Sequence, residues 1–237
     1  MTTFVLVHGA WHGGWCWHKI VPRLEAMGHR AVAPDMPGRG DDDIPIAGVT
    51  LDDIVDRICQ TIDAEDEKVV LVGHSYGGAV ITQTAERRPE KIKSLVYVTA
   101  FLLQDGQAVL DMARADDDSR LNGKVEASDD DATARVRPDA IRECFYGECS
   151  DADVAFARER LGREATVGFR TPMRTTAERF GRLPRTYIEC LKDQAISIAL
   201  QRRLQAALPC QRVFRLDTDH SPFFSAPDAL AEALGRH

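Results

Sequence analysis

The chain has 237 residues, a formal net charge of −7, and 44% hydrophobic and 28% charged residues. This length suits one domain with a substantial core. The acidic balance argues against a nucleic-acid partner, because phosphate binding needs a basic face, and no apolar run reaches the roughly 18 residues that span a membrane.

The N-terminus enters strand-like sequence by Phe4, which leaves no room for a signal peptide, so we expect a cytoplasmic protein. Without a secretory signal the six cysteines should be reduced. Cys144 and Cys149 are the only close pair, and no second pair stands near them at zinc-site spacing. We therefore expect no bound metal.

The first predicted strand is residues 4–7, and a glycine-rich loop follows it over 8–15. Such a loop at a strand tip can turn backbone N–H groups toward a neighbouring site. His8 and His12 are four apart, but the glycine between them argues against a helix, and no Glu follows His8 as in zinc proteases. We expect both to brace the loop by hydrogen bonds.

The sequence then predicts a helix over 17–27, a strand over 31–33 and a helix that begins at Thr50, with Asp53 completing a capping box. Residues 69–72 are four consecutive β-formers, and they run directly into Gly-His-Ser-Tyr-Gly-Gly and an apolar helix. Another strand is predicted over 94–99.

The G-x-S-x-G motif between a buried strand and a helix indicates a nucleophile elbow at Ser75. A turn this tight brings the helix close to the strand, so Gly73 and Gly77 must lack side chains. Ser75 Oγ should stand at the carboxyl edge of the sheet. The helix N-terminus beside it offers free N–H groups where negative charge can develop at low cost.

Residues 102–182 lack a strand of comparable strength and carry acidic clusters and short helical patterns over 138–145 and 150–161. About eighty residues is too long for a connection between two strands. We therefore expect an inserted helical cap. Residues 1–101 and 183–237 would form the core of the same single domain.

Strand character returns over 185–190 and 211–216, with an amphipathic helix between them and a last helix capped by Ser225 and Asp228. The alternation of strands and helices predicts an α/β fold with a mostly parallel sheet flanked by helices. Catalytic groups in such sheets gather on loops at the carboxyl ends of the strands.

A serine hydroxyl needs a base, and the ordinary histidine pKa near 6.5 suits that role. His220 follows the last strand, where it can reach back over the sheet to Ser75. Asp193, after the preceding strand, completes the chain order serine, acid, histidine. Asp105, after the strand before the cap, is the alternative acid.

The backbone N–H groups of Ala10 and Tyr76 are the expected oxyanion hole. Aromatic residues on loops around the site are candidates for binding the substrate, which would then be apolar or aromatic: Trp11, Tyr76, Phe223 and Phe224.

Four segments resemble the α/β-hydrolase superfamily, specifically its branch of plant methyl esterases and hydroxynitrile lyases: residues 8–17, 73–78, 192–194 and 219–220. The resemblance implies the α/β-hydrolase fold with six strands in the order 2-1-3-4-5-6. It also implies the catalytic triad Ser75, Asp193 and His220, and no cofactor.

Lyases of this branch carry a threonine and a lysine where this chain has Gly9 and Ser221. Without that ammonium group to steady departing cyanide, the resemblance favours a carboxylesterase acting on small ester substrates. A lyase and a small-molecule receptor remain alternatives. The sequence leaves the oligomeric state open, a homodimer included.

Overall fold

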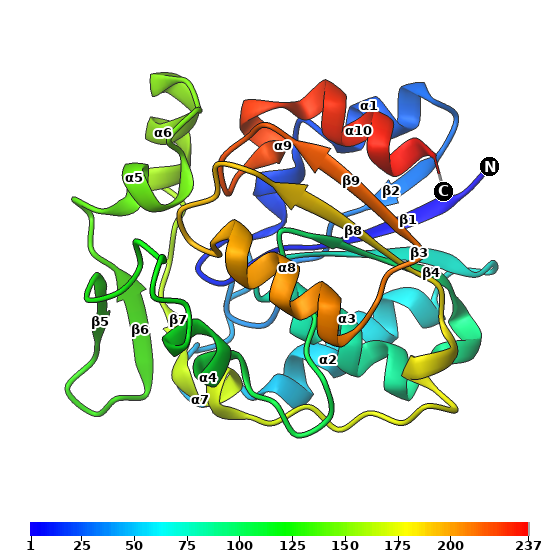
Figure 1. The fold of residues 1–237 in the computed structure, drawn as a ribbon, viewed down its shortest axis with the longest axis horizontal. Helices are drawn as coiled ribbons and strands as arrows, with labels where there is room; N and C mark the ends of the chain where they lie inside the picture. Colours follow the sequence, from blue (N-terminus) through cyan, green and yellow to red (C-terminus); the bar gives the residue numbers. More distant parts are fainter. Residues whose placement is uncertain (237) are drawn as a thin grey trace.

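A computed structural model describes residues 1–236 and contains a six-stranded parallel sheet (Figure 1). Its strands lie in the order β2-β1-β3-β4-β8-β9, so numbering the six along the chain gives 2-1-3-4-5-6. The predicted fold and strand order are therefore confirmed. The strands are β1 (Thr3–Val7), β2 (Arg30–Val32), β3 (Val69–His74), β4 (Ile92–Val98), β8 (Arg185–Cys190) and β9 (Arg212–Leu216).

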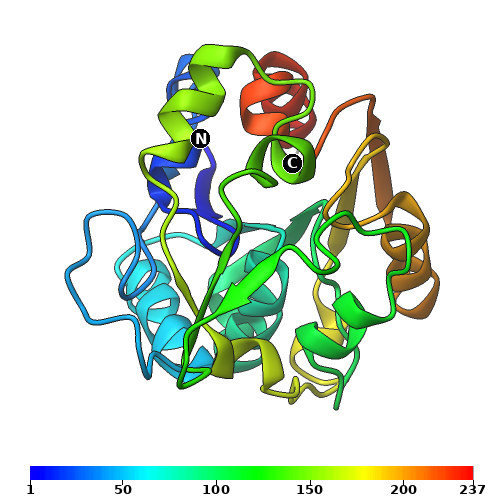
Figure 2. The same cartoon turned by 90° about the vertical axis from the view of Figure 1, so that its left-hand side faces the viewer.

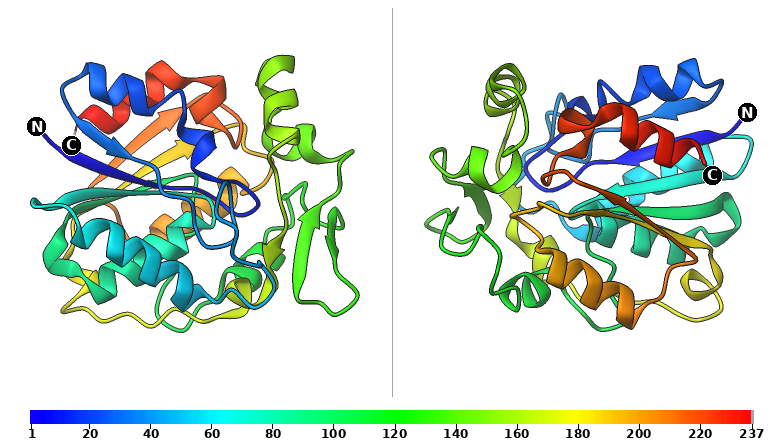
Figure 3. Two further views of the ribbon diagram at one scale, coloured as in Figure 1. Left: turned by 180° about the vertical axis from the view of Figure 1, so that it is seen from behind. Right: turned by 45° about the horizontal axis from the view of Figure 1, so that its top comes forward.

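Helices cover both faces of this sheet. One face carries α1 (Val21–Ala26), α9 (Pro222–Ser225) and α10 (Pro227–Gly235), and the other carries α2 (Leu51–Asp63), α3 (Gly77–Arg87) and α8 (Ile198–Ala207), as Figures 1 and 3 show. β1, β3 and most of β4 are fully buried, as strands covered on both faces must be. The short 3-10 helices are η1 (Gly14–Trp17), η2 (Pro89–Lys91) and η3 (Phe180–Arg182).

Local sequence signals account for several boundaries. Thr50 accepts from the Asp53 N–H and Asp53 accepts from the Thr50 N–H, which is the predicted capping box of α2. The helix predicted over 17–27 is shorter, because η1 precedes it and α1 begins only at Val21. Ser225 does not cap α10, since its hydroxyl donates to Asp219 at 2.7 Å.

The segment between β4 and β8 stands over the strand tips (Figure 2). The segment contains short helices, as expected of a helical cap, and it also forms a three-stranded antiparallel sheet that the sequence did not predict. Its strands are two to four residues long, too short to show a period in the sequence. The cap elements are α4 (Val109–Arg114), β5 (Val125–Ala127), β6 (Thr133–Val136), α5 (Ile141–Phe145), α6 (Asp151–Arg158), β7 (Glu164–Ala165) and α7 (Thr166–Arg170).

Within residues 1–236, no helix is both long enough and apolar enough to cross a bilayer. The six cysteines are free thiols, and five of them are buried.

The contact between α3 and the sheet leads to a first prediction. A Cβ on Gly77 would lie 2.7 Å from the Val7 carbonyl oxygen and 2.8 Å from that of His8, both backbone atoms. We expect Gly77→Ala to lower the free energy of unfolding by about 1–3 kcal/mol, because the helix must move away from β1. Chemical denaturation followed by circular dichroism measures this change.

Gly147→Ala is the matched control, because a Cβ there meets nothing within 4 Å. It should alter stability by no more than about 0.5 kcal/mol. Equal effects of the two substitutions would show that the close approach at Gly77 carries no special cost.

Candidate active site

Ser75 occupies a strained turn between β3 and α3. Its φ of 54° lies in the left-handed region that non-glycine residues rarely adopt. The Ser75 N–H donates to the Val98 carbonyl at 3.3 Å, and its own carbonyl accepts from Phe101 at 3.1 Å. A Cβ on Gly73 would approach the Gly77 carbonyl oxygen to 2.5 Å, so the turn needs glycine there. This is the geometry expected of a nucleophile elbow.

His220 and Asp193 meet in a buried hydrogen bond. His220 follows β9, Asp193 follows β8, and Nδ1 of the imidazole lies 2.6 Å from Oδ2 of the carboxylate. The carboxylate also accepts from the N–H groups of Ala195 and Ile196 and from the hydroxyl of Thr99. With Nδ1 donating to Asp193, the neutral imidazole presents Nε2 as its proton acceptor.

Asp105, the alternative acid, does not take this place. It is exposed, and its Oδ1 accepts from the Thr175 N–H at 2.8 Å. Of the two acids considered, the structure brings only Asp193 to the histidine.

His74 joins the elbow to the histidine loop. Its Nε2 lies 2.8 Å from the His220 carbonyl oxygen, and the two rings are 4.6 Å apart. Burial lowers the pKa of His74 well below its usual value, so the ring is neutral and donates through Nε2. Because His74 directly precedes Ser75, this bond fixes the position of the His220 loop relative to Ser75.

Ser75 Oγ itself makes no hydrogen bond within the described chain, so the bond between the serine and His220 is not formed in this structure. Such catalytic bonds are often long without substrate and shorten in the reacting complex.

Ala10 and Tyr76 lie beside Ser75 on the wall of one cavity. Neither backbone N–H donates a hydrogen bond to any residue of the range 1–236, so both are free to bind an anionic oxygen. Tyr76 precedes the first residue of α3, where the helix dipole adds positive character. The arrangement can stabilise negative charge next to the serine hydroxyl.

His8 and His12 brace the first loop by hydrogen bonds, as expected from the glycine between them. His8 Nδ1 lies 2.8 Å from the Gly9 carbonyl, and its Nε2 accepts from the Met36 N–H at 3.1 Å. His12 Nδ1 lies 2.8 Å from the Ala10 carbonyl. Burial lowers the pKa of His8 to about 3 and that of His12 to about 4, so both rings stay neutral.

The cavity has a volume of about 430 Å³ and mainly apolar walls. Trp11 and Tyr76, which the sequence offered as candidates for binding the substrate, both line it. The cap supplies much of the remaining wall through Val109, Leu110, Ala113, Leu121, Val125 and Phe169.

Phe223 and Phe224 do not line this cavity, which corrects the prediction that they bind substrate. Both are buried in α9. The Phe223 ring packs edge-on against His74 at 5.0 Å, and the Phe224 ring stacks on Tyr146 at 6.0 Å. They support the histidine loop from behind.

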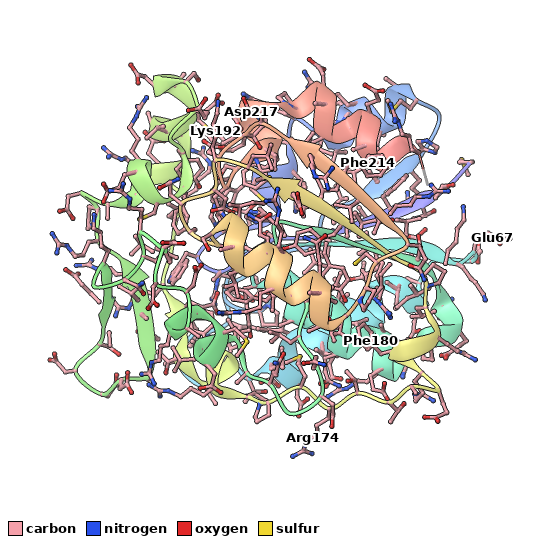
Figure 4. The ribbon with its side chains drawn as sticks, viewed as in Figure 1. Glu67, Arg174, Phe180, Lys192, Phe214 and Asp217 are labelled. Carbon is pink, nitrogen blue, oxygen red and sulfur yellow. The ribbon has the colours of Figure 1, made fainter. Side chains whose placement is uncertain are left out.

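Polar contacts hold the cap against the loops that carry Asp193 and His220. Lys192 and Asp217, labelled in Figure 4, lie side by side after β8 and β9, 3.1 Å apart, and Lys192 also pairs with Glu148 of the cap at 3.0 Å. Asp219, next to His220, accepts from the Glu148 N–H at 2.8 Å.

Sequence reasoning missed three residues at this site. Thr99 donates to the Asp193 carboxylate, and like Ser75 it has a positive φ, 37°. Arg39 and Glu164 form a buried ion pair whose carboxylate accepts from the Trp11 N–H at 3.2 Å. Thr99 follows the strand beside the elbow, which is a signal that the sequence offers. Arg39 and Glu164 are 125 positions apart, and no sequence pattern connects them.

Comparison with known proteins adds independent evidence. The model of the alpha/beta hydrolase family matches residues 4–233. Methylesterase 1 of Arabidopsis thaliana is 32% identical, over 97% of this chain and 93% of its own length. The pyrethroid hydrolase of Sphingobium wenxiniae is 31% identical, over 99% of this chain and 86% of its own length. The chain spans 62% of the length of a longer chloroplastic relative from Arabidopsis thaliana.

Solved structures agree with this fold. A pyrethroid hydrolase from Sphingobium faniae superposes with a TM-score of 0.90 at 30% identity, covering 99% of this chain and 96% of its own. A methylesterase from Arabidopsis superposes with a TM-score of 0.89 at 27% identity, covering 100% of this chain and 98% of its own. With the family model spanning nearly all of its length, the chain belongs to the alpha/beta hydrolase family.

Proposed function

We propose that this chain is a carboxylic ester hydrolase that cleaves small apolar or aromatic esters through a serine acyl-enzyme. One observation carries the proposal: a buried Asp193–His220 pair lies 2.6 Å apart, joined through His74 to an elbow serine beside two free N–H groups. The relatives named methylesterase and pyrethroid hydrolase support ester hydrolysis as the reaction class.

The groups have distinct roles in this mechanism. Ser75 Oγ attacks the ester carbonyl while His220 Nε2 takes its proton, and the developing oxyanion accepts from the N–H groups of Ala10 and Tyr76. His220 then protonates the departing alcohol. The same imidazole activates a water molecule that releases the acid, and Asp193 stabilises the imidazolium in both steps.

The apolar walls of the cavity support an apolar or aromatic substrate, because burying such a group removes its surface from water. The surroundings of position 9 do not favour the lyase alternative. A Cβ on Gly9 would lie 2.9 Å from both His74 Nδ1 and Ser75 Cβ, so the threonine used by related lyases has no room there. Position 221 holds a buried serine in place of a lysine.

Ser75→Ala tests the proposal directly. A fluorophosphonate probe should label the wild-type protein but not this variant, and turnover of nitrophenyl and methyl esters should fall by about 10⁵ to 10⁶. Ser128→Ala, in an exposed turn of the cap, is the control and should behave as wild type. Labelled wild-type protein that turns over no ester would favour the receptor alternative, and cyanide release from mandelonitrile would favour the lyase.

Turnover should fall as the pH is lowered, because a protonated His220 cannot accept the serine proton. His8 and His12 do not cause this loss, since burial lowers their pKa values to about 3 and about 4. They affect stability instead. The unfolded chain binds their protons below about pH 6.5, so the free energy of unfolding should decrease from that pH downward.

Initial rates and the folded fraction are therefore measured at each pH. A rate that only follows the folded fraction would contradict the role of His220 as base.

Thr99→Val should lower kcat about tenfold with little change in KM, because Asp193 loses a donor that fixes its carboxylate. Valine keeps the branched shape at this strained backbone position. Thr99→Ser retains the hydroxyl and should keep most of the activity. A serine variant as slow as the valine variant would assign the effect to packing.

A further inference from the structure

The cap and the core are joined by a buried ion pair between Glu164 on β7 and Arg39 in the loop after β2. Their side chains are only 1% and 2% exposed. Arg39 donates through Nε to Glu164 Oε2 at 3.1 Å and through Nη2 to Oε1. A buried pair of this kind is weak evidence for stability, because desolvation of both charges offsets their attraction. Its contacts indicate another role.

The carboxylate of Glu164 also accepts from the Trp11 N–H at 3.2 Å and from the Ala165 N–H at 3.1 Å. With two donors from Arg39, all four acceptor positions of the carboxylate are used. An amide has only one acceptor oxygen and could not satisfy the same four donors. Burial raises the pKa of Glu164, and the Arg39 charge opposes this rise.

The Trp11 N–H belongs to the peptide that joins Ala10 to Trp11. Glu164 holds the N–H of this peptide, and His12 Nδ1 lies 2.8 Å from its carbonyl oxygen. Trp11 has a φ of 63°, a conformation that needs such outside support. The peptide is therefore fixed at both polar ends, directly next to the free N–H of Ala10.

The cap contacts Trp11 at two further points. Gly162 donates its N–H to the Trp11 carbonyl at 2.9 Å, and the Trp11 indole donates to the Ala134 carbonyl at 3.1 Å. Together with Glu164, three separate cap residues bind this one loop residue, so the position of the cap determines the conformation of the loop.

We propose that Glu164, fixed by Arg39, is a positioning residue for the oxyanion hole: it holds the Ala10–Trp11 peptide and thereby directs the Ala10 N–H toward the reacting carbonyl. The inference rests on the function proposed above. It makes the cap part of the catalytic apparatus, because displacement of β7 would release the loop that stabilises the oxyanion.

The test compares Glu164→Gln with Glu189→Gln. Glu189 is a buried carboxylate on β8 that pairs with Arg215 and Arg202 and makes no contact with the first loop. We expect Glu164→Gln to lower kcat about 10- to 100-fold with KM changed less than threefold, a fraction of the loss of a whole oxyanion donor. Glu189→Gln should keep kcat within about twofold of wild type.

The second readout is the inhibition constant of a trifluoromethyl ketone. Ser75 Oγ adds to its carbonyl and the serine proton passes to His220, which leaves an alkoxide in the oxyanion hole. For Glu164→Gln this constant should rise by the same factor as kcat/KM falls. A purely structural role would lower the melting temperature and leave both constants unchanged in the folded protein.

The single variant leaves the Arg39 charge buried without its partner, which can prevent folding. The double variant Arg39→Met/Glu164→Leu avoids this, because it removes both charges. It should show the same losses of kcat and inhibitor affinity. A folded double variant with wild-type constants would overturn this inference alone. Wild-type protein that neither turns over esters nor takes the fluorophosphonate label would refute the proposed function and this inference with it.

Discussion

The structure depends on the close approach of the first turn of α3 to β1 and β3. No side chain separates them at Gly73 or Gly77, and a methyl group at either position would overlap backbone atoms. The turn that joins β3 to α3 at this contact holds Ser75 in a strained conformation, with a φ of 54°. Gly9 of the first loop packs against the same turn, because a Cβ there would lie 2.9 Å from Ser75 Cβ.

Three buried carboxylates organise the polar surroundings of the site. Asp193 accepts from donors in the loop after β8, from Thr99 and from His220. Glu164 binds the first loop, and Asp219 binds the cap through the Glu148 N–H and its own loop through the Ser221 N–H. Each carboxylate accepts from two backbone N–H groups that would otherwise lie buried and unpaired, at a cost of about 1–3 kcal/mol each. Three side chains thus stabilise the geometry of the candidate site, each through several hydrogen bonds.

Most of the core could be predicted from the sequence, because strand runs and helix caps are local patterns and strand tips in such sheets meet at one edge. That rule selected Asp193 and His220 correctly as neighbours. The cap sheet could not be predicted, since β5 is fully exposed and β7 has two residues. Nor could the roles of Phe223 and Phe224, because a phenylalanine that supports a loop from behind has the same sequence signature as one that lines a pocket.

The core and the cap contribute different parts of the site, and this separation affects how the cavity can change during evolution. Ser75, Asp193 and His220 lie on loops that follow strands of the core sheet, whereas much of the cavity wall is built by α4 and by the segment that leads into β5, where Asn122, Gly123 and Val125 are exposed. Substitutions at these exposed positions would change the shape of the cavity without altering the residues that hold the sheet together. The shape of the cavity can therefore change by small evolutionary steps, each with little cost in folding free energy.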